Sequence, residues 1–86
     1  MLEQEFTIVN KLGLHARASA LLVKTASRFH SEVRLEREGV KVNGKSIMGI
    51  LMLALGPGTA VRLKTNGSDE EEAMQVLSGV LGRHAD

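Results

Sequence analysis

A histidine and an arginine lie two residues apart in the stretch 11–19, where a strand pattern gives way to a helix pattern. Gly13 permits a sharp change of direction just before them, which places His15 at the start of the predicted helix. The first N–H groups of a helix have no partner within it, so this end of a helix binds anions. The planar guanidinium of Arg17 suits a phosphate or a carboxylate. A titratable nucleophile, backbone donors and a cation together indicate transient phosphate on His15.

A simpler interpretation of the same residues stays open. A histidine before a helix is often only a weak cap, and an exposed arginine is usually solvated. Short motifs also match by chance. The residue types alone therefore leave phosphoryl chemistry as one of two interpretations of His15 and Arg17.

Composition predicts a small globular protein and argues against some functions. A chain of 86 residues has the length of one domain, and we expect residues 1–86 to form it. With 43% hydrophobic residues, the chain has enough apolar material for a buried core. A net charge of +1 and only two aromatic residues argue against nucleic-acid partners, which are bound by basic surfaces and aromatic stacking.

The same survey predicts a cytoplasmic protein without a metal or a cofactor. The absence of cysteine excludes disulfides and cysteine-based zinc sites, and it fits a reducing compartment. There is no signal-peptide pattern, and the longest apolar run, 47–55, is too short to insert across a membrane. The three histidines lack the spacing of metal ligands, and we expect His30 and His84 to be solvent-exposed without a role.

Hydrophobic periodicity predicts the elements that must position these residues. Alternation predicts four strands, at 5–9, 32–36, 40–42 and 60–65. Helical spacing predicts helices over 16–29, over a short segment that starts at Ile47 with Ser46 as its cap, and after Ser68. The order βαββαβα predicts an α+β fold, an open-faced β-sandwich with a mostly antiparallel four-stranded sheet and three helices on one face.

Two helices carry more detailed expectations. In the first helix, we expect a narrow stripe of small side chains to lie close to the sheet; the stripe consists of Ala16, Ala20, Val23 and Ala26. Leu21, Leu22 and Phe29 should widen this stripe. Lys24 and Arg28 extend the cationic side that Arg17 begins, or form an ordinary solvated face. In the last helix, Ser68 and Glu71 have the spacing of a capping box.

One motif is rejected. Residues 39–46 match the letters of the phosphate-binding P-loop. That loop follows a buried strand and opens a long helix, whereas here the residues between the two glycines alternate as a strand. We therefore expect no nucleotide binding at this segment.

Two stretches together carry a resemblance to a known family. The sequence reads GLHAR at 13–17 and NGKSIMG at 43–49, and with this spacing and chain length it resembles the HPr family of histidine-containing phosphocarrier proteins. The resemblance covers essentially the whole chain, including the predicted order of strands and helices. It favours phosphoryl chemistry over the simpler interpretation of His15.

The resemblance implies a role for each stretch. In this family a phosphoryl group passes from phosphoenolpyruvate through enzyme I to a histidine, and then to enzyme IIA components of sugar-transport systems. It implies that Nδ1 of His15 is the phosphoryl acceptor and that Arg17 steadies the phosphate. A neutral imidazole has a ring-nitrogen lone pair available for attack on phosphorus. The protein would then be a carrier and not an enzyme with its own small-molecule substrate.

Ser46 matches the family's regulatory serine, which an HPr kinase/phosphorylase modifies with ATP. The simpler interpretation, a plain helix cap, needs only an oxygen atom. The residues that align with the family's docking surface for its partners come from both helices: they are Ala16, Ala20, Lys24, Ile47, Met48 and Leu51. Phosphate on Ser46 would place negative charge inside this surface and repel an acidic partner.

Two positions depart from the family's usual sequence. Ala18 stands where the family commonly has proline, and Ser27 where it commonly has lysine. Proline fixes the entry into a helix, whereas alanine is an excellent helix former. We therefore expect the helix to form, with a less pre-organised His15 loop and an altered partner preference.

Three functions compete at this point. The first is a phosphocarrier for sugar uptake, which we expect to be a monomer with transient partners. The second is a regulatory phosphoprotein of the same fold, tied to nitrogen or carbon control and not engaged in transport. The third is an interaction module whose histidine is never phosphorylated, and the presence of both His15 and Arg17 argues against it.

Overall fold

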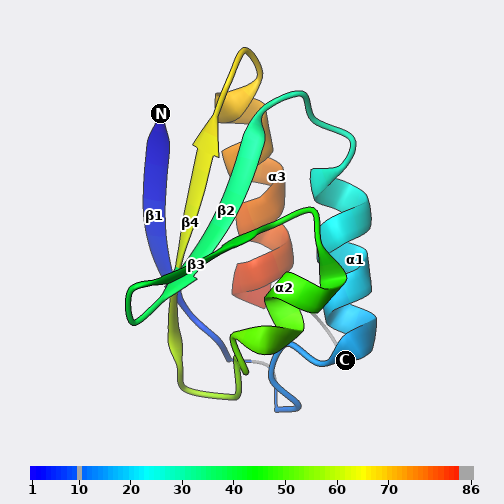
Figure 1. The fold of residues 1–86 in the computed structure, drawn as a ribbon, viewed down its shortest axis with the longest axis vertical. Coiled ribbons are helices and arrows are strands. Elements are labelled where there is room, and N and C mark those ends of the chain that lie inside the picture. Colours follow the sequence, from blue (N-terminus) through cyan, green and yellow to red (C-terminus); the bar gives the residue numbers. More distant parts are fainter. Residues whose placement is uncertain (10, 84–86) are drawn as a thin grey trace.

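The computed structural model describes residues 1–9 and 11–83. Along the described chain the elements follow the predicted order of strands and helices (Figure 1). They are β1 (Leu2–Thr7), α1 (Ala16–Ala26), β2 (Glu32–Arg37), β3 (Val40–Asn43), α2 (Ile47–Met52), β4 (Ala60–Asn66) and α3 (Glu70–Arg83).

The strands form one sheet in the order β1-β4-β2-β3, and every neighbouring pair is antiparallel. All three helices cover the same face of this sheet (Figure 1). Because side chains alternate along a strand, one face of β2 and β4 is buried under the helices; its residues are Val33, Leu35, Val61, Leu63 and Thr65. The predicted fold class, an open-faced α+β sandwich, is confirmed.

The opposite face of the sheet is open and charged. Lys64 on β4 pairs with Glu36 on β2 at 3.1 Å, and this hydrogen bond lowers the pKa of the Glu36 carboxyl. Arg62 pairs diagonally with Glu3 at 3.7 Å. The hydrophobic core therefore lies entirely on the helix side of the sheet.

Helix α1 uses a different face from the predicted one. The expectation is wrong for Ala16 and Ala20, which are exposed, whereas Ala26, Leu22 and Phe29 are buried as expected and Val23 is half-buried. The buried face is instead formed by Ala18, Leu22 and Ala26, of which none exceeds 1% exposure. The expected stripe and the buried face share Ala26 but point in different directions, and both contain alanines, so small side chains could not determine the phase. The large Leu22 side chain determines it, because its burial removes far more apolar surface from water.

Several element boundaries also differ from the prediction. Strand β1 begins at Leu2 and ends at Thr7, because its pairing with β4 runs from Leu2 opposite Thr65 to Thr7 opposite Ala60. Helix α1 ends at Ala26 and not at Phe29. The N–H group of Phe29 donates to the carbonyl of Ala26 at 3.1 Å, a three-residue spacing that turns the chain out of the helix.

The segment that resembles a P-loop is a β-hairpin. Glu38 and Gly39 both have positive φ values, of 50° and 84°, as the tightest hairpin turns require. The following residues form β3, which pairs with β2 from Val40 opposite Arg37 to Asn43 opposite Arg34. The segment thus lacks the loop-to-helix geometry of a phosphate-binding loop.

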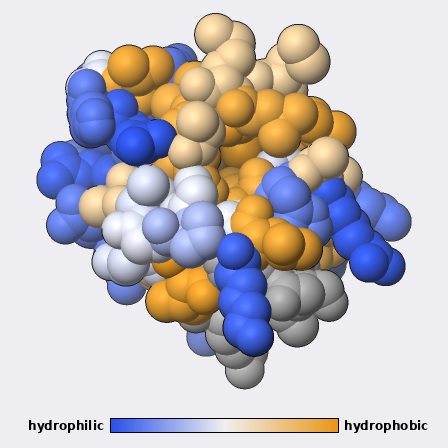
Figure 2. Space-filling model, turned by 90° about the horizontal axis from the view of Figure 1, so that it is seen from below, coloured by the Kyte–Doolittle hydropathy of each residue, from blue (hydrophilic) through white to orange (hydrophobic). Residues whose placement is uncertain are grey.

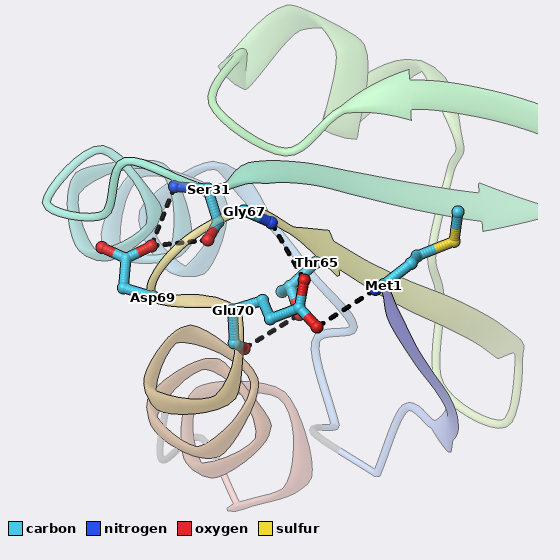
Figure 3. Close-up of polar contacts among 6 residues, drawn as sticks. All are labelled: Met1, Ser31, Thr65, Gly67, Asp69 and Glu70. Atoms are coloured by element: carbon cyan, nitrogen blue, oxygen red, sulfur yellow. Dashed lines mark hydrogen bonds and ion pairs between the residues drawn. The ribbon is translucent and has the colours of Figure 1, made fainter.

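The start of α3 corrects the predicted capping box. The helix begins at Glu70, and the carboxylate of Glu70 accepts the N–H of Gly67 at 3.0 Å, so the reach-back contact lies one residue earlier than the Ser68–Glu71 pair (Figure 3). Asp69 instead reaches across to the turn after α1, where it accepts the N–H groups of His30 and Ser31, each at 2.9 Å. This contact joins α3 to the start of β2 at the end of the molecule opposite the N-terminus of α1 (Figures 1 and 3).

Candidate functional site

His15 is the N-cap residue of α1. Its backbone is extended, with φ −72° and ψ 179°, and its carbonyl accepts the first helical hydrogen bond, from Ser19 N–H at 2.8 Å. The N–H groups of Ala16, Arg17 and Ala18 precede that bond and lie at the positive end of the helix. The imidazole makes no capping hydrogen bond to the helix. The ring therefore lies beside the backbone donors without serving as their cap.

The ring of His15 is half-buried. Its Nε2 atom is buried. The assignment of Nδ1 as the phosphoryl acceptor stays a prediction. Arg17 in the same helical turn is exposed, so its guanidinium is accessible to an anion at the helix terminus.

The residues before His15 are held by the chain that follows α2. Gly13 has a φ of +66°, and a Cβ atom there would lie 2.6 Å from the carbonyl oxygen of Leu55. Leu14 N–H donates to that same oxygen at 2.7 Å. The hydroxyl of Ser19 donates to the carbonyl of Leu14 at 2.9 Å. A glycine is therefore needed at position 13, and the Leu55 carbonyl is the anchor of the His15 loop.

Sequence reasoning missed part of this support. The roles of Ser19 and Leu55 depend on contacts with Leu14, and neither residue carries a sequence signal for them. Gly13 was predicted as a turn residue, which is consistent with its left-handed backbone.

Ser46 is the N-cap of α2, as predicted. Its hydroxyl oxygen accepts the N–H of Gly49 at 3.1 Å, and its carbonyl accepts the N–H of Ile50 at 3.1 Å. Ser46 is half-buried, while Ile47 and Met48 beside it are exposed. The hydroxyl that caps the helix thus lies at the border of an accessible apolar surface.

The six residues aligned with the family's docking surface are all exposed, and α1 and α2 pack against each other. We call these six residues the docking surface. Figure 2 shows a broad apolar area on this end of the molecule, bordered by charged side chains. The structure adds Leu21, which is 41% exposed next to Ala20 and was assigned to the core stripe by the sequence pattern. Lys24 lies about 13 Å along α1 from His15 and therefore outside the histidine's immediate surroundings.

His30 lies apart from this site. His30 is exposed, and its backbone N–H binds Asp69. His84 lies outside the described residues. Within residues 1–9 and 11–83, no group of three histidine, aspartate or glutamate side chains is placed to hold a metal ion. No helix among the same residues is long and apolar enough to cross a membrane.

Comparison with known proteins gives one family. Residues 2–82 match the family described as the PTS HPr component phosphorylation site. A curated relative, the phosphocarrier protein HPr of Xylella fastidiosa strain Temecula1, is 55% identical over 78 residues, which cover 91% of this chain and 88% of that protein.

Solved structures agree with this result. HPr from Thermoanaerobacter tengcongensis superimposes with a TM-score of 0.91 at 48% identity, covering 94% of this chain and 91% of that one. Crh, the Bacillus subtilis catabolite repression protein, gives a TM-score of 0.79 at 44% identity and covers 100% of this chain and 99% of its own. The Crh structure is described as a domain-swapped dimer.

Proposed function

Because this chain belongs to the HPr phosphocarrier family, we propose that it accepts a phosphoryl group on His15 from phosphorylated enzyme I and passes it to enzyme IIA components of the sugar phosphotransferase system. The observation that carries this proposal is the position of His15 at the N-cap of α1, where its side chain does not cap the helix. A histidine that served only as a cap would direct a ring nitrogen to a backbone N–H group of the first turn.

The chemistry follows from the groups at this helix terminus. The lone pair of Nδ1 forms a bond to phosphorus while the bond between phosphorus and the donor breaks. The resulting phosphoryl group carries negative charge next to the first N–H groups of α1, which stabilise it. The guanidinium of Arg17 adds a charge-assisted donor on the exposed side. In transfer to the next protein, a nucleophile of that protein forms a bond to phosphorus while the Nδ1–phosphorus bond breaks and its electron pair returns to Nδ1.

The exposure of the site suits a carrier and not an enzyme with a closed pocket. Enzymes that act on small molecules use concave pockets that exclude water. Here His15 is half-buried beside the exposed residues Ala16 and Arg17, and the docking surface adjoins the histidine through Ala16. Two different proteins can therefore reach the same phosphoryl group in turn.

We also propose that Ser46 is a regulatory phosphorylation site for an HPr kinase/phosphorylase. Support comes from its accessible surroundings, since Met48 is 71% exposed two residues away. A phosphate on Ser46 would lie at a helix N-terminus, where it is tolerated, and would add negative charge to the docking surface. The Ser46 hydroxyl also caps α2, so phosphorylation would modify a residue that stabilises the fold.

A regulatory protein without a role in transport is the alternative, and the likeness to Crh favours considering it. The two functions differ in their partners. Capture of enzyme IIA domains by the chain phosphorylated on His15 supports the carrier, whereas transfer from enzyme I without transfer to any IIA domain supports the regulator. We propose a cytoplasmic monomer, and sedimentation analysis of the chain would detect a dimer like that of Crh.

The decisive experiment is incubation with phosphoenolpyruvate and enzyme I. The chain should acquire one acid-labile phosphate, and His15→Ala should abolish it. His30→Ala is the matched control, because it removes an exposed histidine elsewhere and should leave phosphorylation unchanged. Acid-labile phosphate on the His15→Ala variant would contradict the proposal.

A further inference from the structure

Ala54 adopts a backbone conformation that alanine normally avoids. It follows the end of α2 and has a φ of +51°. In this left-handed region a Cβ atom crowds the carbonyl that follows it, so the position is common for glycine and uncommon for alanine. Such a residue persists only where its surroundings hold it. The contacts around Ala54 therefore identify what holds it.

An arginine from the sheet binds the carbonyl groups at this point. Nη1 of Arg37, the last residue of β2, donates to the carbonyls of Leu53 and Ala54, each at 2.8 Å. The last carbonyls of a helix have no partner within it, and the helix dipole makes this end attractive to a cation. Both bonds constrain the peptide groups on either side of Ala54. Backbone bonds also act here, since Ala54 N–H donates to the Leu51 carbonyl at 3.1 Å and Gly56 N–H to the Ala54 carbonyl at 2.9 Å. Arg37 is the side chain that adds two further bonds at this turn.

The same turn leads directly to the anchor of His15. Leu55 follows Ala54, and its carbonyl is the oxygen that accepts Leu14 N–H at 2.7 Å and packs against Gly13. Leu53, Leu55 and Leu14 are all buried, with exposures of 4%, 4% and 7%. A change in the Ala54 conformation would rotate the adjoining peptide groups and displace the Leu55 carbonyl. The loop before His15 would lose its fixed position.

We propose that Arg37 is a positioning residue for His15. By binding the Leu53 and Ala54 carbonyls it keeps Ala54 in the left-handed conformation, and so fixes the Leu55 carbonyl that anchors Leu14. Arg37 does not contact the phosphoryl group in this scheme. The inference concerns transfer through His15, and so it rests on the proposed function. Its structural part, the hold on Leu14, can be measured separately.

The test compares Arg37→Gln with Arg34→Gln. Arg34 lies on the same strand and pairs with Glu32 at 2.7 Å on the open face of the sheet, so its substitution removes the same charge without touching the turn. Initial rates of phosphoryl transfer from phosphorylated enzyme I give kcat and KM. We expect Arg37→Gln to lower kcat about tenfold, because misplacement of a reacting group is costly, while KM changes less than about twofold. Arg34→Gln should change neither constant.

A rescue variant separates positioning from general destabilisation. Glycine adopts the left-handed conformation without steric cost, so Ala54→Gly should restore kcat in the Arg37→Gln background to within about twofold of the wild type. A kcat for Arg37→Gln equal to that of Arg34→Gln would overturn the proposal. A loss of kcat that Ala54→Gly fails to restore would overturn it as well.

Hydrogen exchange of the Leu14 amide tests the position of the loop before His15 without any phosphoryl transfer. We expect exchange at least about fivefold faster in Arg37→Gln than in Arg34→Gln, and a return toward the wild-type rate when Ala54→Gly is added. If the wild-type chain takes no phosphate from enzyme I, the proposed function is wrong. The Leu14 exchange rates still show whether Arg37 fixes the loop before His15. Equal Leu14 exchange rates in Arg37→Gln and Arg34→Gln would contradict the positioning role of Arg37.

Discussion

The carboxylate of Asp69 accepts hydrogen bonds from both the backbone N–H and the hydroxyl group of Ser31, a residue 38 positions earlier in the chain (Figure 3). It also accepts the N–H of His30. The Ser31 hydroxyl bond, followed by the His30 N–H bond, lowers the pKa of the Asp69 carboxyl from 3.8 to about 2. These hydrogen bonds connect the start of α3 to the turn between α1 and β2, at the end of the molecule away from His15.

The lowered pKa of Asp69 predicts a loss of stability in acid. In the unfolded chain this carboxyl takes up a proton near pH 3.8, whereas in the folded protein it does so near pH 2. Between these values the unfolded state binds more protons, so the free energy of unfolding rises with pH. The contribution of Asp69 is present above pH 3.8 and is lost as the pH falls toward 2. Urea unfolding measured across this range checks it.

Asp69→Asn should lower the free energy of unfolding at neutral pH and reduce its pH dependence in this acidic window. Glu71→Gln is the control, because it removes a charge from the same end of α3 at an exposed position. Glu36 and Glu70 also have carboxyl pKa values below normal, and they remain in both variants. An unchanged acid slope in Asp69→Asn would contradict the assignment.

Two glycine substitutions separate backbone strain from steric overlap near His15. Gly13 and Gly39 both have positive φ, but a Cβ atom at Gly13 would lie 2.6 Å from the Leu55 oxygen, whereas nothing lies within 4 Å at Gly39. Gly39→Ala should cost about 1–2 kcal/mol of unfolding free energy from strain alone. Gly13→Ala should cost about 3 kcal/mol or more, because the loop must also move. Chemical denaturation measures both, and equal costs would refute the role of the overlap.

Arg17 is predicted to act on the transferred phosphoryl group and not on folding. Arg17→Ala should lower the rate constant of phosphoryl transfer about tenfold, because an exposed charge-assisted donor is lost from the reacting anion. The rate constant of Arg17→Lys should lie between those of the wild type and Arg17→Ala, since lysine keeps the charge but lacks the planar guanidinium. Arg28→Ala removes an exposed cation beyond the end of α1 and should leave the rate unchanged. An equal loss of rate in the Arg17 and Arg28 variants would show that only general charge matters.

The capping and regulatory roles of Ser46 can be separated by three substitutions. Ser46→Ala removes the acceptor of the Gly49 N–H and should cost about 1 kcal/mol of unfolding free energy. Ser46→Asn and Ser46→Asp keep a cap, and only the aspartate adds negative charge. Ser46→Asp should therefore slow phosphorylation of His15 by enzyme I about tenfold while Ser46→Asn does not. Equal kinetics for these two variants would count against the regulatory role.

Much of this protein follows from local sequence patterns. Alternation of side chains predicts the buried face of β2 and β4 because a strand presents successive residues to opposite sides. The cap at Ser46 and the helix start at His15 were predictable because a helix terminus is set by residues within one turn of it. The order of these elements then leads to the fold class, and the match to the HPr family agrees with it. The roles of His15, Arg17 and Ser46 in transfer and regulation stay predictions.

Tertiary contacts decided the rest. The alanines of α1 fit two different faces, and the packing of Leu22 in the core selects one. The last helix begins at Glu70, and the residue before it, Asp69, binds Ser31 from the turn after α1 and does not belong to a Ser68–Glu71 capping box. The sequence around Arg37 does not distinguish it from other charged residues at strand ends, and only the fold brings its guanidinium to the Ala54 carbonyl. In each case the deciding interaction joins residues that are distant in the chain, and a local pattern of residue types carries no information about such a partner.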